Sequence, residues 1–210
     1  MNGVYVYIDG FNFYRGISHP GWLRYGWCNF VKLAACLSER AFGSSFPVEA
    51  VKYYTSPVRY GQENAPHERD RQEIWMEAIG AATPEVKVVQ GRFQKIGNQP
   101  RREKETDVSI AVDMQWDAVH FGRAILISAD SDFIPAIRKL RKAGKPVCVF
   151  FPPNQDGYKP PHEDSWRVER ISREDLVECR LSDVIQRPGK QPILWSEYLR
   201  LRQQAGLSTT

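Results

Sequence analysis

The chain has 210 residues and a formal net charge of +4, with 42% hydrophobic and 26% charged residues. This composition fits one compact domain with a sizeable core, and no apolar run is long enough to cross a bilayer. The four cysteines form no C-x-x-C pair, which argues against a zinc site and a disulfide framework. With no signal-peptide pattern at the N-terminus, we expect a cytoplasmic protein, and the mildly basic charge is compatible with a polyanionic partner.

The first predicted strand, residues 4–8, ends at a turn signal, Asp9-Gly10. Asn12 follows three residues after Asp9, and a tight turn at Gly10 could aim both side chains at one point. The alternative is an Asx-turn in which Asp9 only bonds its own backbone. The aromatic region that follows, residues 11–27, either packs in the core or stacks on unpaired bases.

Helical and strand patterns then alternate. The predicted elements are a helix over 29–40, a strand over 48–54, a helix over 69–82 and a strand over 86–93. A loop over 95–104 ends in three basic residues, Arg101, Arg102 and Lys104.

A helix over 108–119 is predicted next, with Thr106 as its N-cap and Asp107 in its first turn. Asp107 shares a face with Ile110 and Met114, and this face should pack on the sheet. The simpler role for Asp107 is an interaction with the helix dipole, worth ~0.3–1 kcal/mol. Asp113 and Asp117 fall off this face, so we expect both to be solvated.

A buried strand over 124–130 and a helix over 133–142 follow, with Asp130 and Asp132 at their junction. Two acids at the carboxyl end of a strand repel each other, and a hard divalent cation would relieve that repulsion. The alternative is that Asp132 caps the helix and Asp130 is solvated.

The remaining elements are less regular. We predict a strand over 147–151, a loop over 154–165, an edge strand over 167–172, a short helix over 173–181, a linker over 182–191 and a last helix over 193–203.

The repeated strand–helix order predicts a parallel sheet, in which ligands collect at the carboxyl ends of the strands. Asp9, Asp107, Asp130 and Asp132 would converge there, and carboxylates without histidines favour Mg²⁺ or Mn²⁺. Such a pocket suits phosphodiester hydrolysis, with a basic rim to hold a nucleic-acid backbone.

At these residues the chain resembles the NYN domain family, the LabA-like branch of the PIN-like nucleases. The resemblance covers residues 3–188, and its three main stretches are Tyr7-Ile8-Asp9-Gly10-Phe11-Asn12, Lys104-Glu105-Thr106-Asp107-Val108 and Ile127-Ser128-Ala129-Asp130-Ser131-Asp132-Phe133. Glu105-Thr106 stands where many relatives carry a Lys- and Gly-rich approach.

The resemblance implies a three-layer α/β sandwich with a mainly parallel, PIN-like sheet of strand order 3-2-1-4-5. We expect this domain to span residues 1–187, followed by a tail over 188–210 that could form a short helix. It also implies a metal-dependent endoribonuclease that uses Mg²⁺ or Mn²⁺ on single-stranded or structured RNA.

Matched residue by residue, Asp9, Asp107, Asp130 and Asp132 correspond to the family's metal-binding, catalytic acids. The residues assigned to substrate binding or to support of these acids are Asn12, Ser128, Ser131, Arg101, Arg102 and Lys104.

Other functions stay open at this point. The main alternative is a catalytically silent NYN module that binds RNA or regulates. A Mn²⁺-dependent glycosyltransferase would explain the D-x-D form of residues 130–132 but not Asp9 or Asp107, and a phosphatase or 5′ nuclease could use the same acids. No membrane partner is expected, and the oligomeric state is open, with a homodimer as one option.

Overall fold

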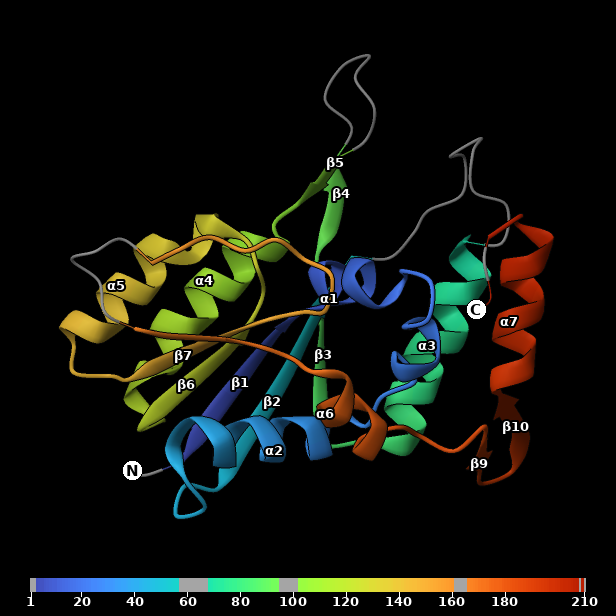
Figure 1. The fold of residues 1–210 in the computed structure, drawn as a ribbon, viewed down its shortest axis with the longest axis horizontal. Helices are drawn as coiled ribbons and strands as arrows, with labels where there is room; N and C mark the ends of the chain where they lie inside the picture. The colour runs from blue at the N-terminus through green and yellow to red at the C-terminus, as the bar shows by residue number, and fades with distance from the viewer. Residues whose placement is uncertain (1–2, 57–67, 95–101, 161–165, 208, 210) are drawn as a thin grey trace.

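Six strands of the chain form one parallel sheet, in the spatial order β3-β2-β1-β6-β7-β8 (Figure 1). The computed structural model describes residues 3–56, 68–94, 102–160, 166–207 and 209. The strands of this sheet are β1 (Val4–Asp9), β2 (Val48–Thr55), β3 (Val86–Gln90), β6 (Arg123–Ile127), β7 (Val147–Phe151) and β8 (Arg167–Arg170). Numbered within the sheet alone, the order is 3-2-1-4-5-6, which confirms the predicted PIN-like order and adds the expected edge strand.

Helices cover both faces of the sheet, so the predicted three-layer architecture is confirmed. The helices are α1 (Gly10–Ile17), α2 (Phe30–Phe42), α3 (Glu68–Ala82), α4 (Thr106–Trp116), α5 (Ile134–Lys142), α6 (Arg173–Glu178) and α7 (Trp195–Gln204). Short 3₁₀ turns are η1 (Leu23–Tyr25), η2 (Asp117–Val119) and η3 (Ser131–Phe133). Neither these helices nor any other part of the described chain forms a helix long and apolar enough to span a membrane.

The alternating side chains of β1 divide the core into two clusters. Val4, Val6 and Ile8 point to the face covered by α1, α2, α3, α6 and α7. Tyr7 points to the opposite face, where Ile110 and Met114 of α4 pack beside α5. Parallel strands that are buried on both faces read as continuous apolar runs, which is why this sheet is visible in the sequence.

Two hairpins differ from the elements that the sequence pattern predicts. The predicted strand over 86–93 is in fact two strands, since β4 (Arg92–Gln94) leaves the sheet and pairs with β5 (Arg102–Lys104). Gly91 is the junction, and a Cβ there would lie 2.5 Å from Thr106 Oγ1. The predicted linker over 182–191 is also wrong, because β9 (Val184–Arg187) and β10 (Lys190–Leu194) form a hairpin.

The helix that follows this hairpin, α7, packs on α3. Trp195 and Tyr198 of α7 are buried, and their rings contact Trp27 and Trp75 of the main core. The last helix of the described chain therefore completes the hydrophobic core on one face of the sheet.

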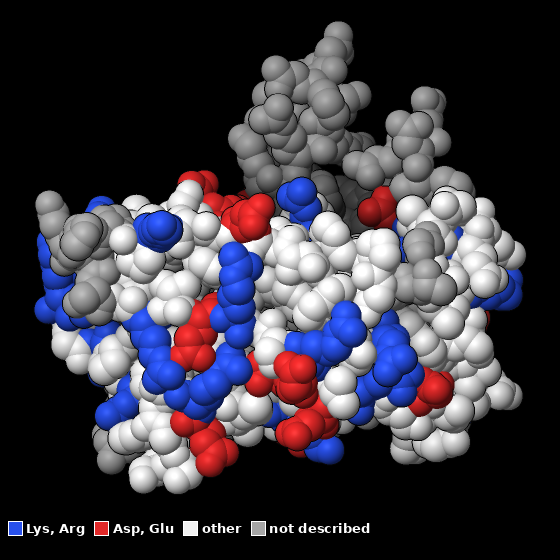
Figure 2. Space-filling model, viewed as in Figure 1, with Lys and Arg blue, Asp and Glu red and all other residues white. Residues whose placement is uncertain are grey.

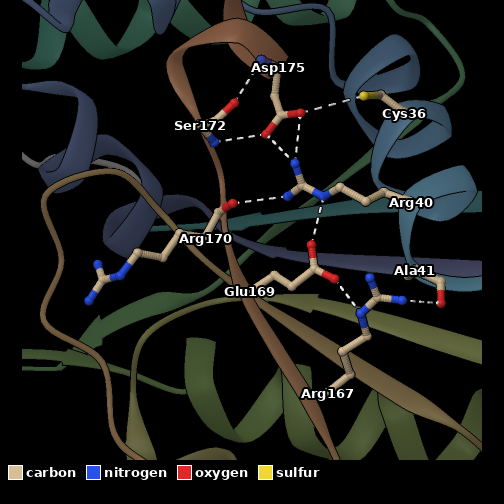
Figure 3. A network of polar contacts seen from close by, with 8 residues as sticks. All are labelled: Cys36, Arg40, Ala41, Arg167, Glu169, Arg170, Ser172 and Asp175. Atoms are coloured by element: carbon tan, nitrogen blue, oxygen red, sulfur yellow. Dashed lines mark hydrogen bonds and ion pairs between the residues drawn. The ribbon is translucent and has the colours of Figure 1, made fainter.

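The edge strand β8 is tied to the helices by a network around Arg40 (Figure 3). The Arg40 guanidinium bonds both oxygens of Asp175, at 2.9 and 2.8 Å, and Nε lies 2.7 Å from Glu169. Asp175 also accepts the backbone N–H of Ser172 in a capping box at the start of α6. One cation thus links α2, β8 and α6, and it satisfies a buried carboxylate that would otherwise be costly.

Candidate functional site

The candidate site lies where β1 and β6 end side by side. Ile8 of β1 pairs in parallel register with Ile127 of β6, so Asp9 and Ser128 follow at the same level of the sheet. This edge is the carboxyl end of the parallel strands, where the helices α1 and η3 begin (Figure 1).

Asp9 is held in a fixed orientation by its neighbours. Its side chain is buried, with 5% exposure of the residue. Oδ1 accepts the backbone N–H of Asn12 at 3.0 Å, which makes Asp9 the N-cap of α1. Oδ2 accepts the hydroxyl of Ser128 at 2.9 Å. We expected a tight turn at Gly10, but Gly10 is the first residue of α1. A Cβ at Gly10 would lie 2.5 Å from Tyr54 O.

Ser128 joins the two strand ends. Its Oγ donates to Asp9 and accepts the backbone N–H of Asp130 at 3.1 Å. Asn12 makes a second link, because its Oδ1 accepts the backbone N–H of Ala129 at 3.0 Å. The predicted residues Asp9, Asn12, Ser128 and Asp130 are therefore brought together by hydrogen bonds, in which Asp130 takes part through its backbone N–H.

The remaining residues of the second motif are more exposed. Asp130 is half-buried and caps η3, since its Oδ1 accepts the backbone N–H of Asp132 at 2.9 Å. The side chains of Asp132 and Ser131 are exposed. Within the described part of the chain, the Ser131 hydroxyl makes no hydrogen bond to Asp9 or Asp130, in contrast to Ser128.

Asp107 lies in the first turn of α4, as predicted, but it is exposed rather than on the buried face of that helix. Thr106 is the first helical residue and not the N-cap. Its hydroxyl lies 2.9 Å from Ser56 Oγ, just after the end of β2. Glu105 occupies the cap position with a left-handed backbone (φ 86°). α4 begins at the sheet edge where β1 ends (Figure 1).

The basic rim is defined only in part. Arg101 lies outside the described residues, while the backbones of Arg102 and Lys104 belong to β5. The β4–β5 hairpin projects from the same edge of the sheet as the end of β1 (Figure 1). On the face shown in Figure 2, positive and negative side chains are interspersed. The ion pairs of Arg40 with Glu169 and Asp175 show the same mixing of charges.

Phe11 and Tyr158 extend the site beyond the predicted residues. Phe11 precedes Asn12 and is 54% exposed, with the guanidinium carbon of Arg15 5.7 Å from its ring centroid. Tyr158 lies in the loop after β7, and burial raises its pKa to about 12, with a contribution from the negative charge of Asp130. The aromatic motif pointed to Phe11, but nothing in the loop's sequence pointed to Tyr158.

Contrary to the prediction that both acids are solvated, Asp117 is buried and the partly exposed Asp113 is paired with a lysine. Lys52 Nζ lies 2.6 Å from Asp117 Oδ2 and 3.1 Å from Asp113 Oδ2. Tyr7 donates to Asp117 at 2.8 Å and Tyr54 to Asp113 at 2.7 Å. Burial lowers the pKa of Lys52, but hydrogen bonds to the two acids outweigh it and the net shift is upward. The helical spacing missed this because Lys52 comes from the interior of β2.

The site fits a hard divalent cation by the chemistry of its donors, all of which are carboxylate, hydroxyl or amide oxygens. Among the described residues, no three or more His, Cys, Asp or Glu side chains converge to form a complete metal cage. Mg²⁺ commonly binds through only one or two carboxylates, with water and substrate phosphates completing its shell. Asp9 and Asp130, linked through Ser128, match that requirement.

The comparisons with known proteins agree with the fold. The NYN domain matches residues 3–160. A crystal structure of a protein of unknown function from Vibrio parahaemolyticus superposes with a TM-score of 0.57 at 18% identity, over 82% of this chain and 94% of that one. At this identity the likeness shows a shared fold. No curated protein matches this chain.

Proposed function

We propose, because this chain belongs to the NYN domain family, that it is a metal-dependent endoribonuclease acting at the ends of β1 and β6. The NYN domain belongs to the PIN-like nuclease superfamily and indicates a nuclease-like, RNA-related function. The observation that carries the finer proposal is the hydrogen-bonded series from Asp9 through Ser128 to Asp130. It ties the Asp9 carboxylate at the end of β1 to the backbone of Asp130 after β6, so the two acidic residues lie close together.

Asp9 and Asp130 are the residues proposed to hold Mg²⁺ or Mn²⁺ directly, with Asp107 and Asp132 acting directly or through water. A bound divalent cation supplies charge neutralisation at the phosphate and activation of water. Ser128 keeps Asp9 Oδ2 in place and holds the backbone that carries Asp130 beside it. The Asn12 side chain joins α1 to the loop after β6 by a hydrogen bond, which holds this part of the site in place in the absence of substrate.

RNA is the proposed substrate. The negatively charged site needs cations around it to hold a phosphodiester backbone, and Arg101, Arg102 and Lys104 are the residues proposed for this role. Phe11 offers an exposed ring next to Asn12 on which an unpaired base can stack. We therefore favour a single-stranded segment at the cleavage site.

The test is cleavage of labelled single-stranded RNA by the purified protein with Mn²⁺ or Mg²⁺. The double variant Asp130→Asn with Asp132→Asn should lose metal-dependent cleavage, while Asp183→Asn, whose side chain is 61% exposed after α6, should keep it. Chelation with EDTA should also abolish the activity.

Equal cleavage by wild type and double variant would contradict the assigned site. Salt-sensitive RNA binding by both proteins without any cleavage would contradict the nuclease and support the RNA-binding module in its place.

A further inference from the structure

One side of α4 carries an unusual stripe of exposed apolar residues. Val108, Val112 and Trp116 are 66%, 56% and 77% exposed, and Val119 in η2 is 67% exposed. Their spacing of four, four and three residues puts them on one side of the helix, while Ile110 and Met114 on the other side pack against the sheet. Exposed apolar residues that form a stripe of this kind usually mark a site of interaction with another molecule.

The stripe borders an open groove between α4 and α5. The groove has a volume of about 530 Å³ and is lined by Val112 and Trp116 from α4 and by Pro135, Ala136 and Lys139 from α5. Gln115 Nε2 donates to Ala136 O at 3.0 Å, which holds the two helices side by side. The groove is therefore part of a rigid helix pair.

Charge changes sign along this surface. Both helices run away from the carboxyl edge of the sheet, because α4 leads into β6 and α5 follows it. Glu105 is exposed where α4 begins, and Lys139 and Lys142 are exposed toward the end of α5. Since Ala136 is level with Gln115, Lys139 lies level with the end of α4. Among the side chains that the structure describes on this surface, an acidic one therefore lies at one end, apolar ones in the middle and basic ones at the other end.

We propose that a second copy of this chain covers this groove, with the two α4 helices antiparallel across a twofold axis. A twofold interface must be complementary to itself, and a surface with opposite charges at its two ends meets that condition only in the antiparallel arrangement. Val112 and Trp116 then lie near the axis, where each fills the partner's groove. Glu105 approaches the partner's Lys139 at each end.

The oligomeric state of the full chain tests this proposal. Sedimentation velocity over roughly 1–100 μM protein should show a dimer. Val112→Glu and Trp116→Glu should each raise the dimer dissociation constant at least about tenfold, because both place a charge at the centre of the interface. Val177→Glu is the matched control, since Val177 is 51% exposed on α6, and it should leave the dimer intact. A monomer at every concentration, or a dimer that resists both substitutions, would overturn the proposal.

A charge exchange tests the antiparallel orientation. Glu105→Lys and Lys139→Glu should each weaken the dimer by repulsion between like charges, and the double variant should recover wild-type affinity. A double variant weaker than either single one would contradict the orientation. Circular dichroism of every variant checks that the fold is retained. None of these measurements requires nuclease activity, so the dimer and the proposed function succeed or fail separately.

Discussion

The hydroxyl of Ser128 donates to Asp9 Oδ2 at 2.9 Å, although the two residues are 119 positions apart. Ser128 is fully buried, and its oxygen also receives the backbone N–H of Asp130. The serine thus orients the Asp9 carboxylate and ties it to the backbone of Asp130, the two residues that the proposed function assigns to one cation. Removing its hydroxyl should therefore lower activity more than it lowers the stability of the fold.

We therefore expect Ser128→Ala to lower kcat/KM for RNA cleavage by roughly 10–100-fold, the usual cost of losing a residue that orients a metal ligand. Ser44→Ala is the control, because Ser44 is exposed between α2 and β2 and should tolerate the change. The measurement is steady-state cleavage of a fluorescent RNA across a Mn²⁺ titration. An unchanged rate for Ser128→Ala, with an unchanged metal requirement, would show that Asp9 needs no such orientation.

The exposed ring of Phe11 predicts an effect on RNA binding. Stacking of one base on an aromatic side chain is worth ~1–3 kcal/mol, so Phe11→Ala should weaken the binding of single-stranded RNA by about 5–150-fold. Phe11→Trp should preserve binding. Val177→Ala, which removes an exposed apolar side chain on α6, should leave RNA binding unchanged.

Binding is measured by fluorescence anisotropy in EDTA, so that cleavage does not interfere, with an RNA duplex in parallel. The duplex should bind Phe11→Ala and wild type alike, because paired bases cannot reach the ring. Equal affinity of Phe11→Ala and wild type for the single strand would remove Phe11 from the site.

The sequence predicted the sheet better than its surroundings. Strands such as 147–151 are buried on both faces, so their apolar runs identify them without tertiary information. The hairpin β9–β10 has short strands on the surface, and its Pro188 and Gly189 resembled a linker. α1 was missed because its first residue is glycine, and its helical conformation depends on the Asp9 cap and the packing of Phe13.

The candidate site was likewise predicted in part. Asp9 and Asp130 were predictable because each follows a strand, and the carboxyl ends of parallel strands meet at one edge. The role of Ser128 as the link depends on register between β1 and β6, which no local pattern contains. Asp107 was placed correctly in the first turn of α4, but its side chain is exposed, and helical spacing alone does not determine burial at the end of a helix.

The buried cluster around Lys52 should contribute strongly to stability. Lys52→Met leaves Asp113 and Asp117 without their cation, and breaking a buried ion pair from one side typically costs ~3–5 kcal/mol. The free energy of unfolding in urea measures this cost. Arg69→Ala removes an exposed pair with Glu73 on α3 and should change it by less than ~1 kcal/mol. A loss for Lys52→Met no larger than that of the control would mean that water replaces the lysine.

The tyrosines of the same cluster predict a loss of stability in alkali. Burial, followed by the hydrogen bond to Asp117, raises the pKa of Tyr7 well above its ordinary value of 10.0. Tyr54 is shifted in the same direction by burial and by Asp113. Above pH 10 the unfolded chain releases these phenolic protons while the folded chain retains them, so the unfolded state binds fewer protons and the free energy of unfolding falls as pH rises.

Below pH 10 both states hold the protons, and the tyrosines make no pH-dependent contribution. Tyr7→Phe removes one of the groups whose proton the folded chain retains, so its unfolding free energy should decline less steeply between pH 10 and 11 than that of the wild type, even if the variant is less stable at pH 8. Urea unfolding at a series of pH values measures both slopes. All other titrating groups are the same in the two proteins, so parallel slopes for wild type and Tyr7→Phe would contradict the burial of a neutral Tyr7.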